Sequence, residues 1–159
     1  MQNNNPLPQR KLPRLHGYDY SSNGAYFVTI CTHQRYHLFG TITDNVMNCT
    51  SAGHMAQRLW LEIPQHFPYI ELDLHVIMPN HMHGIIVITE PDQHNLSTVI
   101  GSYKSAVTRH LRQQRAYTGQ KIWQVGFQDH IIRNEASWNT IRQYVQTNPA
   151  RWHDDTFYS

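Results

Sequence analysis

The fold of this chain is decided by one stretch, Val76-Ile77-Met78-Pro79-Asn80-His81-Met82-His83-Gly84-Ile85-Ile86-Val87-Ile88. An apolar run enters a turn at Pro79-Asn80 and continues as a second strand, which predicts an antiparallel hairpin. Side chains alternate between the two faces of a strand. We therefore expect His81 and His83 on one face of the strand. Met82, Ile86 and Ile88 should lie on the other face, under the core helices.

Two imidazoles on one strand face provide half of a divalent metal site. The pair alone is a weak signal, because His-x-His also arises by chance in a chain with twelve histidines. The alternative is two solvent-facing histidines on a half-exposed strand. Residues near the C-terminus favour the metal interpretation.

The composition indicates a globular protein. The 159 residues, 40% hydrophobic and 15% charged, suit a single domain over residues 1–159. No run is long enough to cross a bilayer and no signal peptide is visible, so a cytoplasmic location without membrane contact is expected. Cys31 and Cys49 have no metal-type spacing and are expected to be free thiols. The formal charge of +2 does not indicate a nucleic-acid binder by itself.

The order of expected elements predicts the fold class. Strands are expected at 25–32, 72–78, 81–89 and 127–132, with a short extended segment at 41–43. Helices are expected from 52 to Pro64, which ends or kinks the first helix, over 96–114, and over 135–147 after the cap Asn134. This order is typical of an α+β, ferredoxin-like split βαβ antiparallel sheet, with helices on one face, the other face open, and a further C-terminal helix.

Two basic segments allow contact with nucleic acid. Residues 1–16 form a polar arm that carries Arg10, Lys11 and Arg14; it is either a flexible terminus or an arm on phosphates. On the helix at 96–114 and just beyond it, a basic face follows three- or four-residue steps. Its members are Lys104, Thr108, Arg112 and Arg115. A solvated face is the favoured interpretation of this pattern, and a phosphate-contacting ridge is the alternative.

The last helix carries two polar residues on one side, Tyr144 and Asn148, four positions apart. Asn148 precedes Pro149, so its amide oxygen is expected in a frayed last turn, free to join the two imidazoles. Such a set suits Mg²⁺ or Mn²⁺ when a phosphate adds oxygens. Zinc is disfavoured because no cysteine or acidic residue is evident nearby. Tyr144 is then placed as a nucleophile, although packing is the simpler role for a tyrosine there.

Two motifs together carry a family resemblance: residues 78–84 (MPNHMHG) and residues 144–149 (YVQTNP). They resemble the single-tyrosine transposases of the His-hydrophobic-His (HUH) endonuclease superfamily, most closely the REP-associated tyrosine transposases. The segments 17–18, 25–29, 122–124 and 127–134 follow in the family's order and extend the resemblance over nearly the whole chain. Other single-tyrosine transposases have glutamine where this chain has Asn148.

The resemblance implies both a site and a reaction. His81, His83 and Asn148 would hold Mg²⁺ or Mn²⁺, and Tyr144 would cleave and rejoin single-stranded DNA through a 5′-phosphotyrosine intermediate. The expected substrate is a hairpin of a repetitive extragenic palindrome, bound by a monomer or a homodimer. Gly17-Tyr18 would help to read the flank beside the hairpin foot.

Other residues are expected to assist. The cations of the arm and the ridge would hold phosphates, and Tyr18 and Tyr20 would stack on unpaired bases. His130 is a candidate for proton transfer, with a structural role as its alternative. Two other functions remain open: a metal-dependent hydrolase that uses water as nucleophile, and a hairpin-binding module that does not cleave DNA.

Overall fold

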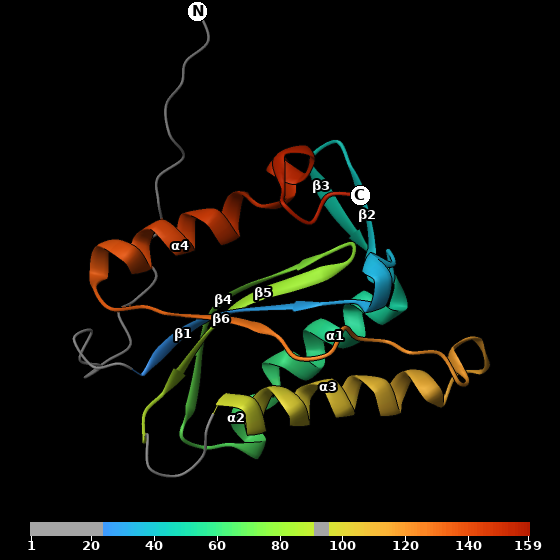
Figure 1. The fold of residues 1–159 in the computed structure, drawn as a ribbon, viewed down its shortest axis with the longest axis horizontal. Coiled ribbons are helices and arrows are strands. Elements are labelled where there is room, and N and C mark those ends of the chain that lie inside the picture. Colours follow the sequence, from blue (N-terminus) through green and yellow to red (C-terminus); the bar gives the residue numbers. More distant parts are fainter. Residues whose placement is uncertain (1–23, 91–95) are drawn as a thin grey trace, which may run out of the picture.

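A computed structural model describes residues 24–90 and 96–159 (Figure 1). The main sheet contains β1 (Ala25–Cys31), β4 (Ile70–Met78), β5 (His81–Ile88) and β6 (Gln128–Ile131), in the order β4-β5-β1-β6. All neighbouring strands are antiparallel. This is the arrangement of the predicted split βαβ sheet, so the predicted fold class is confirmed. The 1–16 arm of the sequence prediction lies outside the described residues.

Helices lie on both faces of the sheet (Figure 1). α1 (Ser51–Leu61), α2 (Ile63–His66) and α3 (Leu96–Arg112) lie on one face, and α4 (Glu135–Thr147) lies on the other. The sequence suggested that this second face is open. α4 covers part of it because Trp138 is buried there with Ala25, Ile85 and Val87. No helix in the described ranges is long and apolar enough to span a bilayer.

Local chemistry explains where the helices begin. The side chain of Thr50 accepts a hydrogen bond from the Gly53 amide at the start of α1, and Asn134 accepts one from Ser137 at the start of α4. Gly84 is required on β5 because a Cβ atom there would lie 2.3 Å from the ring of Trp60. These contacts fix α1 against the sheet directly behind the two histidines.

Two segments differ from the sequence prediction. A separate hairpin of β2 (Gly40–Thr43) and β3 (Val46–Cys49) replaces the single extended segment, and its turn residues Asp44 and Asn45 both have positive φ. Pro149 follows α4 as expected, but the chain continues directly into the 3-10 helix η3 (Pro149–Asp154). Short 3-10 turns also occupy His33–Arg35 (η1) and Arg115–Tyr117 (η2). The segment from η3 onward is important for the site.

Candidate active site

The histidine pair lies at the start of β5, on the face covered by α4. His81 and His83 are 0% and 1% exposed, and their Nε2 atoms are 3.1 Å apart. Met82, between them, is buried in the cluster under α1 and α3. The predicted division of faces is therefore confirmed, and the two imidazoles converge on one point.

The Nδ1 atom of each ring, on the side away from the other imidazole, has a hydrogen-bond partner. Asn80 donates from Nδ2 to the Phe157 carbonyl (2.7 Å), which turns its Oδ1 atom to accept from His81 Nδ1 at 2.7 Å. His83 Nδ1 lies 2.7 Å from Thr29 Oγ1. Ligand histidines in metal sites have such partners on the second ring nitrogen, which fix the tautomer and the ring orientation. The Nε2 lone pair of His81 is thereby aimed into the site.

Burial also fixes the charge of the pair. Loss of hydration lowers the pKa of His81 to about 3, and contact with Asn148 opposes this shift. Loss of hydration, and then the neighbouring His81, lower the pKa of His83 to about 3. Both rings are therefore neutral at pH 7, the form that binds a metal ion.

The metal-free protein is expected to lose stability as the pH falls below about 6.5. The unfolded chain then takes up protons on both histidines that the folded chain does not. The contribution of the two neutral rings to the free energy of unfolding is fully present above their unfolded pKa of about 6.5. It declines as the pH falls from there towards 3. For the two rings together, the loss of unfolding free energy by pH 5 is of the order of a few kcal/mol. Urea unfolding with chelator at pH 7 and pH 5 measures it. The double variant His81→Gln/His83→Gln should flatten the dependence, and an unchanged slope would contradict the prediction.

Asn148 and Asp155 complete the polar side of the site. Asn148 is 2% exposed and helical (φ −58°, ψ −45°), not frayed as the sequence suggested. Its Nδ2 atom donates to Asp155 Oδ2 at 2.9 Å, and its Oδ1 atom is buried without a hydrogen-bond partner among the described residues. Asp155 Oδ2 lies 3.8 Å from His81 Nε2. A buried amide oxygen without a donor is suited to a cation.

This geometry fits a divalent metal ion. His81, His83 and Asp155 each offer a ligand atom, all within 4.8 Å of one another, and the unpaired oxygen of Asn148 adds a fourth donor nearby. Sequence reasoning missed Asp155, because it lies beyond Pro149 where no periodic pattern indicates its direction. An acidic residue therefore does lie beside the two imidazoles, and the prediction that zinc is disfavoured for lack of one is wrong. Carboxylate and amide oxygens with imidazoles suit Mn²⁺ as well.

Tyr144 lies next to the pair on α4. Its side chain is 37% exposed, and its ring centroid is 5.3 Å from that of His83 and 6.0 Å from that of Phe27. Burial, and then the charge of Asp155, raise the pKa of Tyr144, while Asn148 lowers it. The phenol is protonated at neutral pH, so it needs a cation at its target or a base in order to attack.

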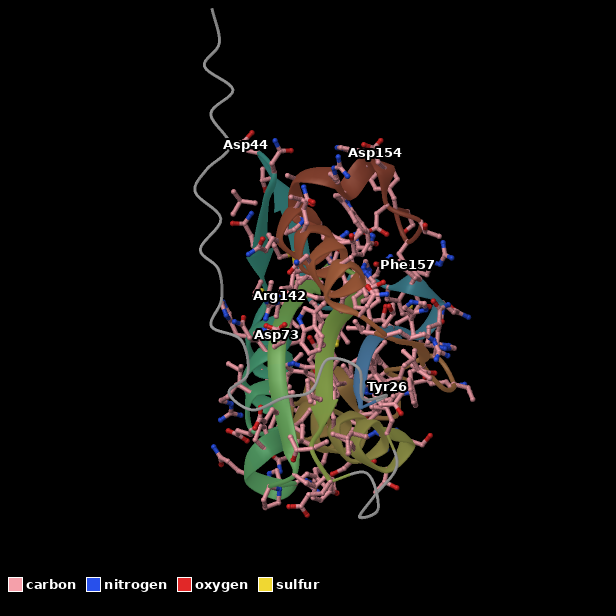
Figure 2. The ribbon with its side chains drawn as sticks, turned by 90° about the vertical axis from the view of Figure 1, so that its left-hand side faces the viewer. Tyr26, Asp44, Asp73, Arg142, Asp154 and Phe157 are labelled. Carbon is pink, nitrogen blue, oxygen red and sulfur yellow. The ribbon has the colours of Figure 1, made fainter. Side chains whose placement is uncertain are left out.

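The C-terminal segment covers the histidines. The ring of Phe157 lies 4.6 Å from His81 and 5.9 Å from His83 between centroids, and its amide donates to Asp155 Oδ1. Figure 2 labels Phe157 in this segment. The Phe157 ring therefore covers both imidazoles, which are themselves buried.

The remaining predicted residues lie elsewhere. Lys104 donates to the carbonyls of Gln124 and Gly126, at 2.9 and 2.8 Å, so much of its hydrogen-bonding capacity is used. Arg112 lines a cavity of about 590 Å³ beside α3, across the sheet from the site, and Arg115 is exposed in η2. His130 is exposed on β6 opposite Phe27. The other predicted DNA contacts are outside the described residues: Arg10, Lys11, Arg14, Gly17, Tyr18 and Tyr20.

Comparisons with known proteins show a family and a shared fold. A family model described as "Transposase IS200 like" matches residues 21–148. A Haemophilus influenzae protein of uncharacterized function is 36% identical over 96% of this chain and 94% of its own length. A second protein of that organism, named provisionally as a REP-associated tyrosine transposase, is 26% identical over 84% of this chain and 74% of its own. A solved REP-associated tyrosine transposase bound to a REP hairpin has the same fold (TM-score 0.62, 24% identity, 84% and 71% coverage).

Proposed function

We propose that this chain, which belongs to the IS200-like transposase family, cleaves and rejoins single-stranded DNA through a phosphotyrosine on Tyr144. The observation that carries the proposal is the position of Tyr144 beside a converging histidine pair, 5.3 Å from the His83 ring. Membership of a transposase family implies a DNA-cleaving enzyme.

In this proposal His81, His83 and Asn148 hold Mg²⁺ or Mn²⁺. Asp155 accepts from Asn148 Nδ2, which turns the unpaired Oδ1 atom into the site, and its carboxylate is a further available ligand. The ion supplies Lewis-acid polarisation of a phosphoryl oxygen and charge stabilisation. The protein contributes orientation, since the hydrogen bonds to both Nδ1 atoms fix the imidazoles.

The proposed reaction is an in-line transfer of a DNA phosphate to Tyr144. The Tyr144 oxygen forms a bond to phosphorus and loses its proton to solvent, while the bond from phosphorus to the 3′ oxygen breaks. The 3′ oxygen takes up a proton and leaves as a free 3′-OH. Rejoining reverses these steps with a 3′-OH of another strand. The phosphotyrosine retains the energy of the diester, so no further energy source is required.

The proposed substrate is a single-stranded hairpin with a short unpaired flank, of the repetitive extragenic palindrome type. Its support is the resemblance of the two motifs and the relative named for REP elements. The test incubates the full chain with Mn²⁺ and end-labelled oligonucleotides: palindromic hairpins with flanks, the same hairpins without flanks, and duplexes. A denaturant-resistant protein–DNA adduct with flanked hairpins supports the proposal. Cleavage of all three substrates without any adduct contradicts it.

Opening the site is expected to increase its activity. Phe157→Ala removes the ring over both histidines while the backbone contact to Asn80 can persist. We expect the rate of adduct formation at low DNA concentration to rise about threefold or more, equivalent to about 0.7 kcal/mol less cost of displacing the ring. The control is Phe67→Ala, which removes a phenylalanine from the loop before β4. A lower rate in Phe157→Ala than in the control would contradict this role.

A hydrolase that uses water is the second candidate. The observation that favours it is the His81, His83 and Asp155 cluster, because two histidines and a carboxylate also form hydrolytic zinc centres. In that case Tyr144→Phe leaves cleavage intact and no adduct forms. Binding without cleavage would instead indicate the hairpin-binding module.

A further inference from the structure

The helix that carries Tyr144 is attached to the sheet by a buried polar cluster that the proposed chemistry does not use. Asp73 Oδ2 on β4 accepts from Trp138 Nε1 at 2.5 Å and from Arg142 Nε at 2.6 Å, both on α4. Figure 2 shows Asp73 and Arg142 close together between the strand and the helix. The side chains of Asp73 and Arg142 are only 6% and 14% exposed.

An irregularity in β4 brings Asp73 to this position. Leu72 pairs with Ile86 and His75 pairs with Gly84, so Asp73 and Leu74 together oppose the single residue Ile85. This is a β-bulge, a feature that redirects side chains and is frequent beside active sites. If the register of the segment that follows (His75 opposite Gly84, Ile77 opposite Met82) continued without a bulge, Asp73 would lie opposite Ile86, on the same face as Ile77 and in the apolar core. With the bulge, Asp73 instead lies opposite Ile85, on the face that α4 covers.

The cluster lies close to Tyr144 along α4 and close to the two histidines across the sheet. Tyr144 is two residues after Arg142, about 3 Å further along the helix axis. Asp73 lies on the strand that pairs with β5, where Val76 is opposite His83. The Arg142 guanidinium also lies over the Trp138 ring, 5.6 Å from its centroid. A displacement of α4 relative to β4 would therefore change the separation of Tyr144 from His83.

On this basis, and resting on the proposed function, we propose that Asp73 is a positioning residue. It fixes α4 against β4 and thereby holds the Tyr144 oxygen within attacking distance of a phosphate at the histidine site. A misplacement of about 1 Å can lower the rate of such a transfer by about 100-fold. Asp73 is not part of the His81, His83 and Asp155 cluster, and its side chain is only 6% exposed, so we expect its loss to leave the affinities for metal ion and hairpin unchanged.

The test combines kinetics with hydrogen exchange. Asp73→Asn keeps the size of the side chain and removes its charge. With saturating hairpin and Mn²⁺, well below the melting temperature, we expect adduct formation to slow about 10- to 100-fold while the Kd for hairpin and for Mn²⁺ changes less than about twofold. In the metal-free protein, amide exchange over residues 139–147 should become about tenfold faster, because Asp73 no longer fixes α4.

A matched control separates positioning from general stability. Tyr103→Phe removes a buried hydrogen bond to the Ala56 carbonyl on the opposite face of the sheet. It should lower the melting temperature without changing the adduct rate of the folded protein or the exchange of α4. Arg142→Lys removes the Nε–H donor but keeps the charge, and should reproduce the phenotype of Asp73→Asn. If Asp73→Asn does not fold, the same measurements on Arg142→Lys test the proposal.

The outcomes distinguish this inference from the proposed function. If the wild-type chain forms no adduct, the proposed function fails, and the exchange data still decide whether Asp73 holds α4. If the wild type is active and Asp73→Asn has an unchanged adduct rate, the inference is overturned. Equal slowing in Tyr103→Phe would likewise overturn it, because the effect would then follow stability rather than position.

Discussion

Replacing Tyr144 with phenylalanine is expected to abolish the covalent protein–DNA adduct and to lower strand cleavage by about 10⁴-fold or more. Phenylalanine keeps the ring that contacts Phe27 and His83, so the fold and the affinity for the hairpin should be preserved. The phenol oxygen is the only group removed. Gel electrophoresis of end-labelled hairpin under denaturing conditions measures adduct and cleavage together.

Tyr158→Phe is the matched control for this result. Tyr158 is 45% exposed against 37% for Tyr144, and it lies in the segment that follows η3. Its loss should leave adduct formation within about twofold of the wild type, since it is not on α4. If Tyr144→Phe still cleaves DNA at a rate close to the wild type, the tyrosine mechanism is wrong and the hydrolase gains support.

Removing either histidine of the pair should have the second large effect. His81→Ala or His83→Ala leaves one imidazole, so the affinity for Mn²⁺ should fall about 100-fold or more and cleavage should become undetectable. Titration calorimetry of the apo protein with Mn²⁺ measures the first effect. Addition of a chelator to the wild-type protein should likewise abolish cleavage.

His130→Ala serves as the control for the histidine variants, because His130 is exposed on β6. It should bind Mn²⁺ as tightly as the wild type does. Its adduct rate also tests the suggestion that it transfers a proton: a loss of about tenfold or more at unchanged metal affinity would support that role. Unchanged Mn²⁺ binding in both His81→Ala and His83→Ala would rule out the histidine site.

The parts of the fold that sequence predicts well are those specified by local chemistry. The hairpin at Pro79-Asn80 and the shared face of His81 and His83 follow from the alternation of side chains along a strand. α4 begins and ends at the predicted residues, Glu135 and Thr147, because an asparagine cap precedes it and a proline follows it. Thr50 caps α1 for the same local reason.

The parts that sequence does not predict depend on contacts between distant segments. Asp155 enters the site only because η3 turns the chain back, and Phe157 is held by Asn80, 77 residues away. The bulge at Asp73 and Leu74 cannot be predicted from the sequence either, because apolar residues continue to alternate along this part of β4. The sequence therefore indicates the central histidines and tyrosine, and the structure adds the residues that surround and position them.

The most direct test of the central claim is to identify the residue that becomes joined to DNA. The adduct formed with Mn²⁺ and a flanked hairpin is digested with nuclease and protease, and the modified peptide is sequenced by mass spectrometry. We predict a nucleotide joined through its 5′ phosphate to the oxygen of Tyr144, with a free 3′-OH on the released strand. A modification on any other residue, or cleaved DNA without a modified peptide, would contradict the mechanism.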